Sequence, residues 1–237
     1  MSKNTDRSIF ENYKWRKNLE ALEGNFQVLK ASINSGSIDR LNPKSNFDYE
    51  ISLSSFIGTQ PDLNFNFSGV SGIAGLSFPT FSTGYNPMTM TLFFNAGICS
   101  DNTPIQFQHR MSTRLFIFNN YGNFYTAPLG FFGGTNYYSI HIDYNLTDLW
   151  WRWIGLPTYE GRGLDLIIGG SWGKFENTSN TAYRSTGNDG YSEIGFGLSR
   201  IPTFISNVVF WSFNWRFGIG ENAKGRTGGS MNIALPF

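Results

Sequence analysis

The sequence predicts an all-β fold, built as one antiparallel, up-and-down sheet of about ten strands. Apolar and polar side chains alternate over most of the chain, and successive side chains of a strand point to opposite faces. Polar connections rich in Gly, Pro, Asn and Ser separate the alternating stretches. No strand–helix–strand pattern occurs, so neighbouring strands are expected to pair antiparallel.

The predicted strands follow one another from residue 25 to residue 237. The clearest is "YYSIHIDYNL", residues 137–146, where Ile140 and Ile142 fall on one face and His141 and Asp143 on the other. The other predicted strands are residues 47–56, 63–69, 88–96, 164–173, 206–220 and 230–237, with weaker ones near 25–34, 111–119 and 190–199.

The composition narrows the class of protein. Charged residues make up 15% of the 237, whereas soluble domains carry about 25%, and aromatic residues reach 17%. A net charge of +1 gives no strong attraction to nucleic acid, so no nucleic-acid partner is expected. The single cysteine, Cys99, excludes an internal disulfide and a cysteine-based metal site.

Residues 1–23 are expected to form a separate N-terminal segment with a short helix over 9–23, followed by one β domain over 24–237. The polar start lacks the apolar centre of a secretory signal peptide, and no apolar run is long enough for a transmembrane helix. Either the protein is not exported, or the chain is a mature form or a part of a longer protein.

Alternation alone does not say which face of the sheet meets water. A soluble sandwich, jelly roll or barrel has its apolar face inside, whereas an outer-membrane barrel turns that face to lipid and lines its lumen with the polar one. Strands of about nine to eleven residues, small residues on the polar face, Tyr and Trp near strand ends and a terminal Phe favour the membrane barrel. We therefore predict a transmembrane β-barrel, and the strand count leaves open whether 237 residues close it.

Two sets of side chains are the candidate functional residues. The polar side chains expected to face the lumen are His141, Asp143, Asp165, Glu193 and Arg216. Buried charges pair or keep water, so we expect Arg216 to pair with an acid, Glu193 before any other, the alternative being that each charge is hydrated. The aromatic residues expected at the membrane–water interface, rather than as a stacking platform for sugars or bases, are Trp150, Trp151, Trp153 and Tyr191.

No catalytic residue is expected. "GGSWG", residues 169–173, matches the G-x-S-x-G of a nucleophile elbow, but no helix pattern follows Ser171 and neither histidine lies downstream. His141 shares a strand face with Ser139 and Asp143 at a spacing of about 6–7 Å, which is too long for a direct hydrogen bond in a catalytic relay. The polar loops lack the acidic spacing of a calcium site, so neither a metal nor a cofactor is expected.

Two stretches resemble one family. "YYSIHIDYNLTDLWWRWIGLP" followed by "GRGLDLIIGGSWG" is similar to paired strands of bacterial outer-membrane barrels that carry a carboxypeptidase-regulatory-like domain in front, within the surface-antigen and assembly-factor group. "GYSEIGFGLSRIPTFISNVVFWSFNWRF", residues 190–217, resembles the final hairpin of that family. The likeness covers about the last hundred residues, and the V-R-G-F/Y loop motif of the assembly factors is absent.

The patterns and the resemblance together imply the C-terminal barrel part of a longer protein of the bacterial outer membrane, structural or transport-related rather than enzymatic. Its implied partners are the lipid bilayer and the outer-membrane assembly machinery, which reads a C-terminal strand ending in Phe. The residues that carry this signal are Ile233, Leu235 and Phe237. Residues 97–110 and 177–190 are expected as external loops, and 149–157 and 200–206 as periplasmic turns.

The alternative function is that of a soluble jelly-roll capsid or lectin-like subunit. Its apolar strand faces would pack between two sheets, and its Asn-, Ser- and Thr-rich faces would form subunit contacts. A barrel lipid hydrolase is the least favoured reading.

Overall fold

The structure is a computed structural model. It describes residues 25–36, 38, 47–61, 64–82, 87–113, 122–128, 132–155, 164–176, 190–202 and 210–234. The predicted helix over 9–23, and Leu235 and Phe237 of the predicted assembly signal, lie outside the described residues.

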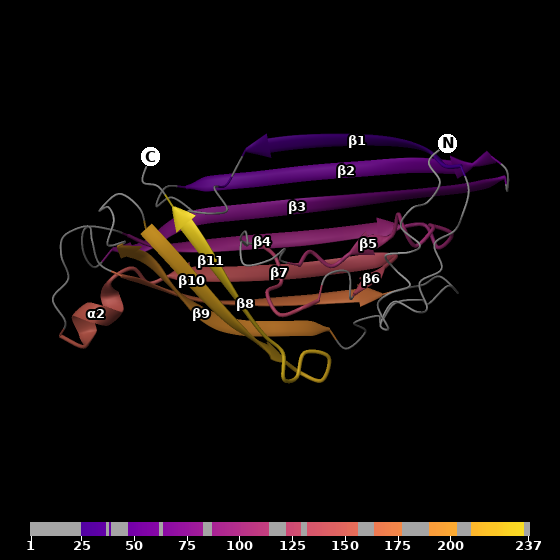
Figure 1. Cartoon of the computed structure of the whole chain (residues 1–237). Coiled ribbons are helices and arrows are strands. Elements are labelled where there is room, and N and C mark those ends of the chain that lie inside the picture. The colour runs from indigo at the N-terminus through magenta and orange to yellow at the C-terminus, as the bar shows by residue number, and fades with distance from the viewer. Residues whose placement is uncertain are drawn as a thin grey trace.

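The described residues contain one nine-stranded antiparallel sheet in which each strand pairs with its neighbours in chain order (Figure 1). Its strands are β1 Gln27–Gly36, β2 Asp48–Gln60, β3 Phe65–Ser82, β4 Pro87–Cys99, β7 Asn136–Asn145, β8 Asp165–Glu176, β9 Tyr191–Pro202, β10 Phe210–Ile219 and β11 Thr227–Ala234. The sheet is strongly curved, and β9 to β11 turn across its concave side (Figure 1). The all-β, up-and-down prediction is confirmed, but β1 and β11 are open edges and the sheet is not closed as a barrel.

The connection between β4 and β7 runs inside the curve of the sheet. We call its described residues, 100–113, 122–128 and 132–135, the inner segment. It contains the two-residue strands β5 (His109–Arg110) and β6 (Gly133–Gly134), which pair with each other. Residues 97–99 of the predicted loop over 97–110 belong to β4, and its location relative to the membrane stays a prediction. The prediction of a sheet strand over 111–119 is wrong for its described residues, 111–113.

The inner segment is held there by apolar packing. Met111, Phe124 and Phe132 form one buried cluster with the inward side chains Phe175 of β8 and Tyr191 of β9. The Phe132 and Phe175 rings stack with centroids 6.3 Å apart. A connection with these aromatic residues buries more apolar surface inside the curve than it would beyond the end of the sheet.

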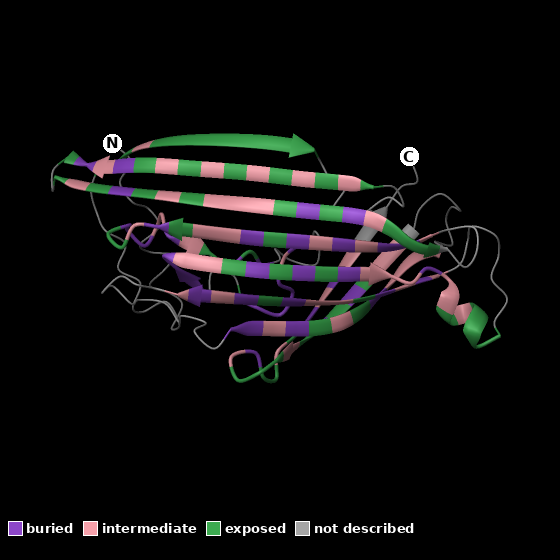
Figure 2. Cartoon of the chain, turned by 180° about the vertical axis from the view of Figure 1, so that it is seen from behind, coloured by how far each residue is buried: buried purple, intermediate pink, exposed green. Residues whose placement is uncertain are grey.

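The two faces of the sheet differ in burial, and burial alternates along the strands (Figure 2). On β7, Ile140 and Ile142 are 38% and 36% exposed, whereas His141 and Asp143 beside them are 2% and 6% exposed. Pairing in register extends this alternation to the neighbouring strands. Further large apolar side chains on the exposed face are Ile51, Leu53, Phe94, Ile168, Trp172, Ile194, Phe196, Phe213, Trp215 and Phe217.

One end of β2 and β3 departs from this pattern. Phe67 is only 2% exposed and faces inward, where its ring lies 5.0 Å from that of Phe107 in the inner segment and 6.2 Å from that of Phe56. In the alternation of residues 63–69, Phe65 and Phe67 are apolar positions, which the membrane-barrel prediction turns outward. They instead form an aromatic lining that the inner segment covers, so the interior is apolar at this end.

A short helix, α2 (Leu149–Trp153), follows β7. Among the described residues, no helix has the length and apolar character needed to cross a membrane.

Candidate functional site in the polar interior

A buried ion pair joins Arg216 of β10 to Asp143 of β7, although β8 and β9 lie between these two strands. The register sets Arg216 of β10 opposite Gly195, Gly195 opposite Gly169, and Gly169 opposite Asp143 of β7. The Nη2 atom of Arg216 contacts Oδ1 of Asp143, and both side chains are buried. A Cβ atom on either glycine would lie 2.7 Å from an atom of Arg216, so the two glycines provide the space through which this side chain reaches its partner.

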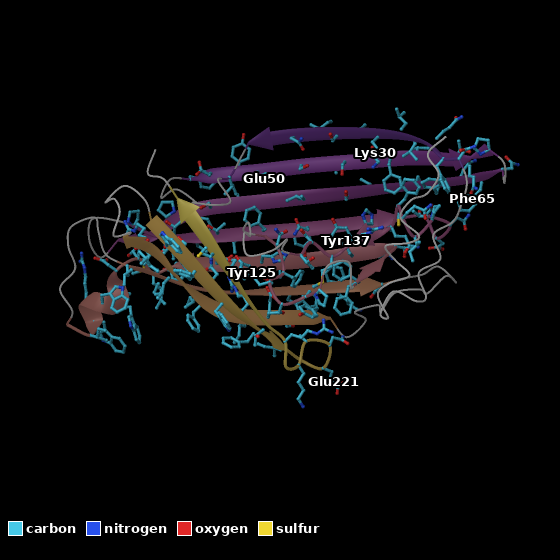
Figure 3. The ribbon with its side chains drawn as sticks, in the orientation of Figure 1. Lys30, Glu50, Phe65, Tyr125, Tyr137 and Glu221 are labelled. Carbon is cyan, nitrogen blue, oxygen red and sulfur yellow. The ribbon has the colours of Figure 1, made fainter. Side chains whose placement is uncertain are left out.

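Arg216 therefore pairs with an acid, as predicted, but the predicted partner is wrong. Glu193 lies two residues before Gly195 on β9, at the neighbouring inward-facing position. It accepts hydrogen bonds from the inner segment instead of pairing with Arg216. Its carboxylate accepts the backbone N–H groups of Tyr125 (2.9 Å) and Thr126 (3.0 Å) and the hydroxyl of Thr126 (2.8 Å). The Arg216 guanidinium lies 5.2 Å from the centre of the Tyr125 ring. Figure 3 places Tyr125 within the curve of the sheet.

Glu193 and its neighbours thus form a clamp on the inner segment. The Tyr191 hydroxyl lies 2.6 Å from Oγ1 of Thr126, and Tyr191 is fully buried beside Phe124. The prediction that Tyr191 is an interfacial aromatic is wrong, because its ring faces the concave side and packs on the inner segment. Gly228 of β11 completes the clamp, since a Cβ there would collide with the backbone carbonyl of Tyr125.

His141 lies in a buried chain of polar side chains. Its Nδ1 atom is 2.9 Å from Oγ of Ser171, its Nε2 atom is 3.2 Å from Oγ of Ser139, and Asn95 Nδ2 donates to the same oxygen at 3.2 Å. The expectation that Ser139 is too far for a direct bond is wrong, because the imidazole is long enough to span one inward step of the strand. The Phe124 ring covers the imidazole with its centroid 4.7 Å away.

A second ion pair, which the sequence analysis missed, joins Arg200 to Asp165. Asn145 Nδ2 donates to the other oxygen of Asp165 at 3.2 Å. Arg200 has φ +56°, and the register of β9 against β10 shifts here, which marks a β-bulge. Two residues of β9 lie between Leu198 and Ile201, whereas one residue of β10 lies between their partners Phe213 and Trp211. The extra residue on β9 allows the side chain of Arg200 to reach the inner face. The three-residue spacing of Leu198 and Ile201 is the sequence signal of this bulge.

The tryptophans of α2 differ in exposure. Trp150 and Trp153 are exposed, with ring centroids 5.6 Å apart, and their predicted place at a membrane–water interface stays a prediction. Trp151 is half-buried and donates its Nε1–H to the Leu164 carbonyl at 2.6 Å, so it ties α2 to the start of β8. Ile233 of the predicted assembly signal lies on β11 opposite Trp211.

No protein-family model matches this sequence, and no curated protein matches it either. Within the described ranges, no cluster of three or more His, Cys, Asp or Glu side chains is arranged to hold a metal ion. The interior therefore has to be interpreted from its own chemistry.

Proposed function

We propose that this chain is part of a transmembrane β-barrel of the bacterial outer membrane, the C-terminal portion of a longer protein, with a structural or transport-related role. The observation that carries the proposal is the inverted burial of the sheet. More than twenty large apolar side chains are exposed, most of them on the outer face, while charged and hydroxyl side chains are buried on the inner one. Contiguous apolar patches above a few hundred Å² are rare on soluble monomers and mark membrane or partner contacts.

The strand dimensions support the same proposal. β2 and β4 have 13 residues and β8 has 12. A tilted strand of about 9–11 residues crosses the hydrocarbon core, so these strands are long enough to span it. Trp150 and Trp153 lie exposed beyond the end of β7, where indole rings settle at the headgroup level.

The jelly-roll alternative requires two sheets packed through their apolar faces. The described strands instead form one meander in which Phe213, Trp215 and Phe217 of β10 are 41–49% exposed.

A non-enzymatic role is supported by the covering of His141 by Phe124 and by the position of Ser171 within β8, paired on both sides. The inner segment, clamped at Glu193, favours a closed or gated interior over a wide pore.

The experiment compares Ile140→Arg with Glu221→Arg in the chain folded into lipid vesicles. Ile140 lies at the middle of β7 on the outer face, whereas Glu221 lies in the exposed turn between β10 and β11 (Figure 3). Arginine facing lipid near the bilayer centre costs about 2–4 kcal/mol and much less near the surface. We expect Ile140→Arg to lower the free energy of unfolding by that amount, in urea titrations followed by tryptophan fluorescence, and Glu221→Arg to leave it unchanged. Equal stability of both variants, or recovery of the parent chain from aqueous buffer without detergent, would overturn the proposal.

A further inference from the structure

A groove with a volume of about 550 Å³ crosses β7 to β10 on the outer face of the sheet. Gly170 of β8 forms its floor, because the register sets this glycine between Ile142 of β7 and Ile194 of β9. The neighbouring outward positions of β8 carry Ile168 and Trp172, which are both exposed. The missing side chain of Gly170 therefore leaves a depression among large apolar side chains. We call this depression the Gly170 groove.

The space above Gly170 is not filled by the described residues. A Cβ atom on Gly170 would lie 3.2 Å from the carbonyl oxygen of Glu193 and 3.5 Å from Cγ2 of Ile194, and no aromatic ring is among its near neighbours. Gly229 of β11 is another outward glycine, and it lies against the ring of Trp215, 3.0 Å from where its Cβ would be. An aromatic ring of the chain thus covers Gly229, whereas the Gly170 groove is open to an occupant from outside.

The lining of the Gly170 groove is almost wholly apolar. Among the described residues that line it, the one polar side chain is that of Tyr144. Its hydroxyl lies 3.0 Å from Oγ1 of Thr80 and donates to Sδ of Met88 at 3.3 Å. β8 pairs with β7 and with β9 at the floor, so its main-chain groups are engaged within the sheet. A peptide or a lipid headgroup placed there would lose hydrogen bonds to water without forming new ones, so the fitting occupant is a hydrocarbon group.

The size and course of the groove favour a single lipid chain over a protein partner. Nine residues line the groove, whereas a specific protein interface takes about 20–30 residues from each side. Ile168 and Phe196, which also line it, lie one outward position nearer to α2 than Gly170 and Ile194 do. The groove therefore runs from the middle of β8 toward the end of the sheet where the tryptophans of α2 are exposed. An acyl chain takes the same course between the middle of a bilayer and the headgroup level.

We infer that the Gly170 groove binds one acyl chain of a phospholipid from the leaflet beside α2. The inference rests on the proposed membrane location and names a lipid partner for that surface. Surrounding lipid is as apolar as the groove, so the hydrophobic effect contributes little to this selection. The selection comes from van der Waals packing of the chain against Ile142, Ile194 and Phe217, in a depression that otherwise lacks contacting atoms.

The test uses the full chain folded in micelles of a short-chain detergent. The probe is a phosphatidylcholine with a diazirine at the middle of one acyl chain. Photolabelling is expected to saturate at a single lipid per chain, with adducts on Ile142, Ile168 and Ile194. Ile51 and Leu53, which are exposed on the outer face of β2, are the reference positions and should take up little label.

Two results of this titration would overturn the inference. Labelling that does not saturate and is equally strong on β2 would show the ordinary contact of an apolar surface with lipid. A dimer of the chain that forms without lipid and prevents labelling would show that a second copy fills the groove.

Gly170→Leu and Gly72→Leu form a matched pair of variants. Both add a leucine at an outward glycine, since Gly72 pairs with the outward Leu53, but Gly170→Leu alone fills the groove. Saturable labelling is expected to be lost in Gly170→Leu and kept in Gly72→Leu, and equal labelling of the two would contradict the inference. If the close carbonyl oxygen prevents Gly170→Leu from folding, Phe217→Ala decides, because it removes one wall of the groove and should weaken labelling without adding an atom.

The two proposals fail in different measurements. A chain that is destabilised by Ile140→Arg in vesicles but shows no saturable labelling would refute the acyl-chain site alone. A chain that Ile140→Arg leaves unchanged would refute the membrane location, and the acyl-chain site with it.

Discussion

β2 and β7 carry the same alternation and yet differ in how deeply they bury it. The inward Ser52 and Ser54 of β2 are only half-buried, whereas Ser139 and His141 of β7 are buried. Figure 2 shows this contrast along the two strands. The inner segment covers β7, and its contacts reach β8 to β11, while β1 and much of β2 lie at the open edge. Alternation therefore decides which face a side chain occupies, and the cover over that face decides what a polar group there costs.

This difference predicts large effects of interior substitutions in β7 to β10 and small ones where inward side chains are only half-buried, as at Ser52 and Ser54 of β2. A buried polar group that loses its partner has no water to replace it, whereas a half-exposed group does. A site in the covered half of the sheet can therefore be compared with a control in the open half.

The largest effect is expected for Asp143→Asn, which leaves Arg216 buried without a carboxylate. Removal of one partner of a buried ion pair costs about 3–5 kcal/mol. We expect a loss of this size in the free energy of unfolding, measured by urea titration of the chain in vesicles. The control is Ser52→Ala on β2, whose hydroxyl donates to Asn34 at an exposed site and should cost less than about 1 kcal/mol.

The pair can also be replaced as a whole. Asp143→Leu combined with Arg216→Leu removes both charges, and such replacements are often neutral or stabilising. We expect the double variant to be more stable than Asp143→Asn. If the double variant is the less stable of the two, the cost lies in packing rather than in an unpaired charge.

The next effect concerns the clamp on the inner segment. Glu193→Gln keeps the volume of the side chain but places an NH₂ group among donors, and hydrogen bonds to a charged group contribute about 1.5–3 kcal/mol. The expected result is faster hydrogen exchange at the amides of Tyr125 and Thr126, with the amides of β2 and β3 unchanged. Uniform acceleration over the whole sheet would show that Glu193 supports the fold in general rather than holding this segment.

A smaller effect is expected at the glycines beneath Arg216. Gly195→Ala introduces a Cβ closer than 3.0 Å to Arg216 and to the backbone of Trp215, and overpacking of this kind costs about 1–3 kcal/mol. Gly72→Ala on the outer face of β3 is the control for a glycine with room beside it, because its nearest neighbour would be at 3.6 Å, an ordinary contact. The control should be neutral or slightly stabilising, since alanine restricts the unfolded chain more than glycine does. Equal losses at both sites would contradict the assignment of Gly195 as a space-making residue.

The sequence predicted the faces of β7 because alternation is a local property of the chain. Ile140 and Ile142 lie outward, and His141 and Asp143 lie inward, as their positions in the pattern require. The partner of Arg216 was not predictable in the same way. It depends on the register of three strand pairings and on two glycines that allow a long side chain to cross them, and no local pattern fixes that register.

The inner segment was missed for a related reason. Residues 97–110 are rich in Asn, Gln, Ser and Thr, which is typical of an exposed loop, and the aromatic residues that anchor the segment come later, at Phe124 and Phe132. Their partners Phe175 and Tyr191 are more than forty residues away in the chain. The position of the β-bulge in β9, by contrast, has a local signal, because Leu198 and Ile201 are three residues apart instead of two. This spacing would have allowed Arg200 to be assigned to the inner face.

The smallest expected effect is a pH dependence at His109, where the inner segment meets the open half of the sheet. Burial lowers the pKa of His109 below its usual 6.5, against a backbone hydrogen bond at Ile98 that raises it, and its ring lies 4.9 Å from that of Tyr137. The unfolded chain therefore takes up the proton first as pH falls. The contribution of His109 to stability is complete above about pH 6.5 and is lost as pH falls through the lowered pKa of the folded state.

His109→Phe keeps an aromatic ring beside Tyr137 and removes this titration, while His141 is present in both proteins. We expect the stability of the parent chain relative to the variant to be constant above about pH 7 and to fall toward pH 5, in urea titrations at each pH. Parallel pH profiles of the two proteins would show that His109 is hydrated in both states. The inner segment would then exclude water only over the covered half of the sheet, which would place the boundary between the two halves between His109 and Phe124.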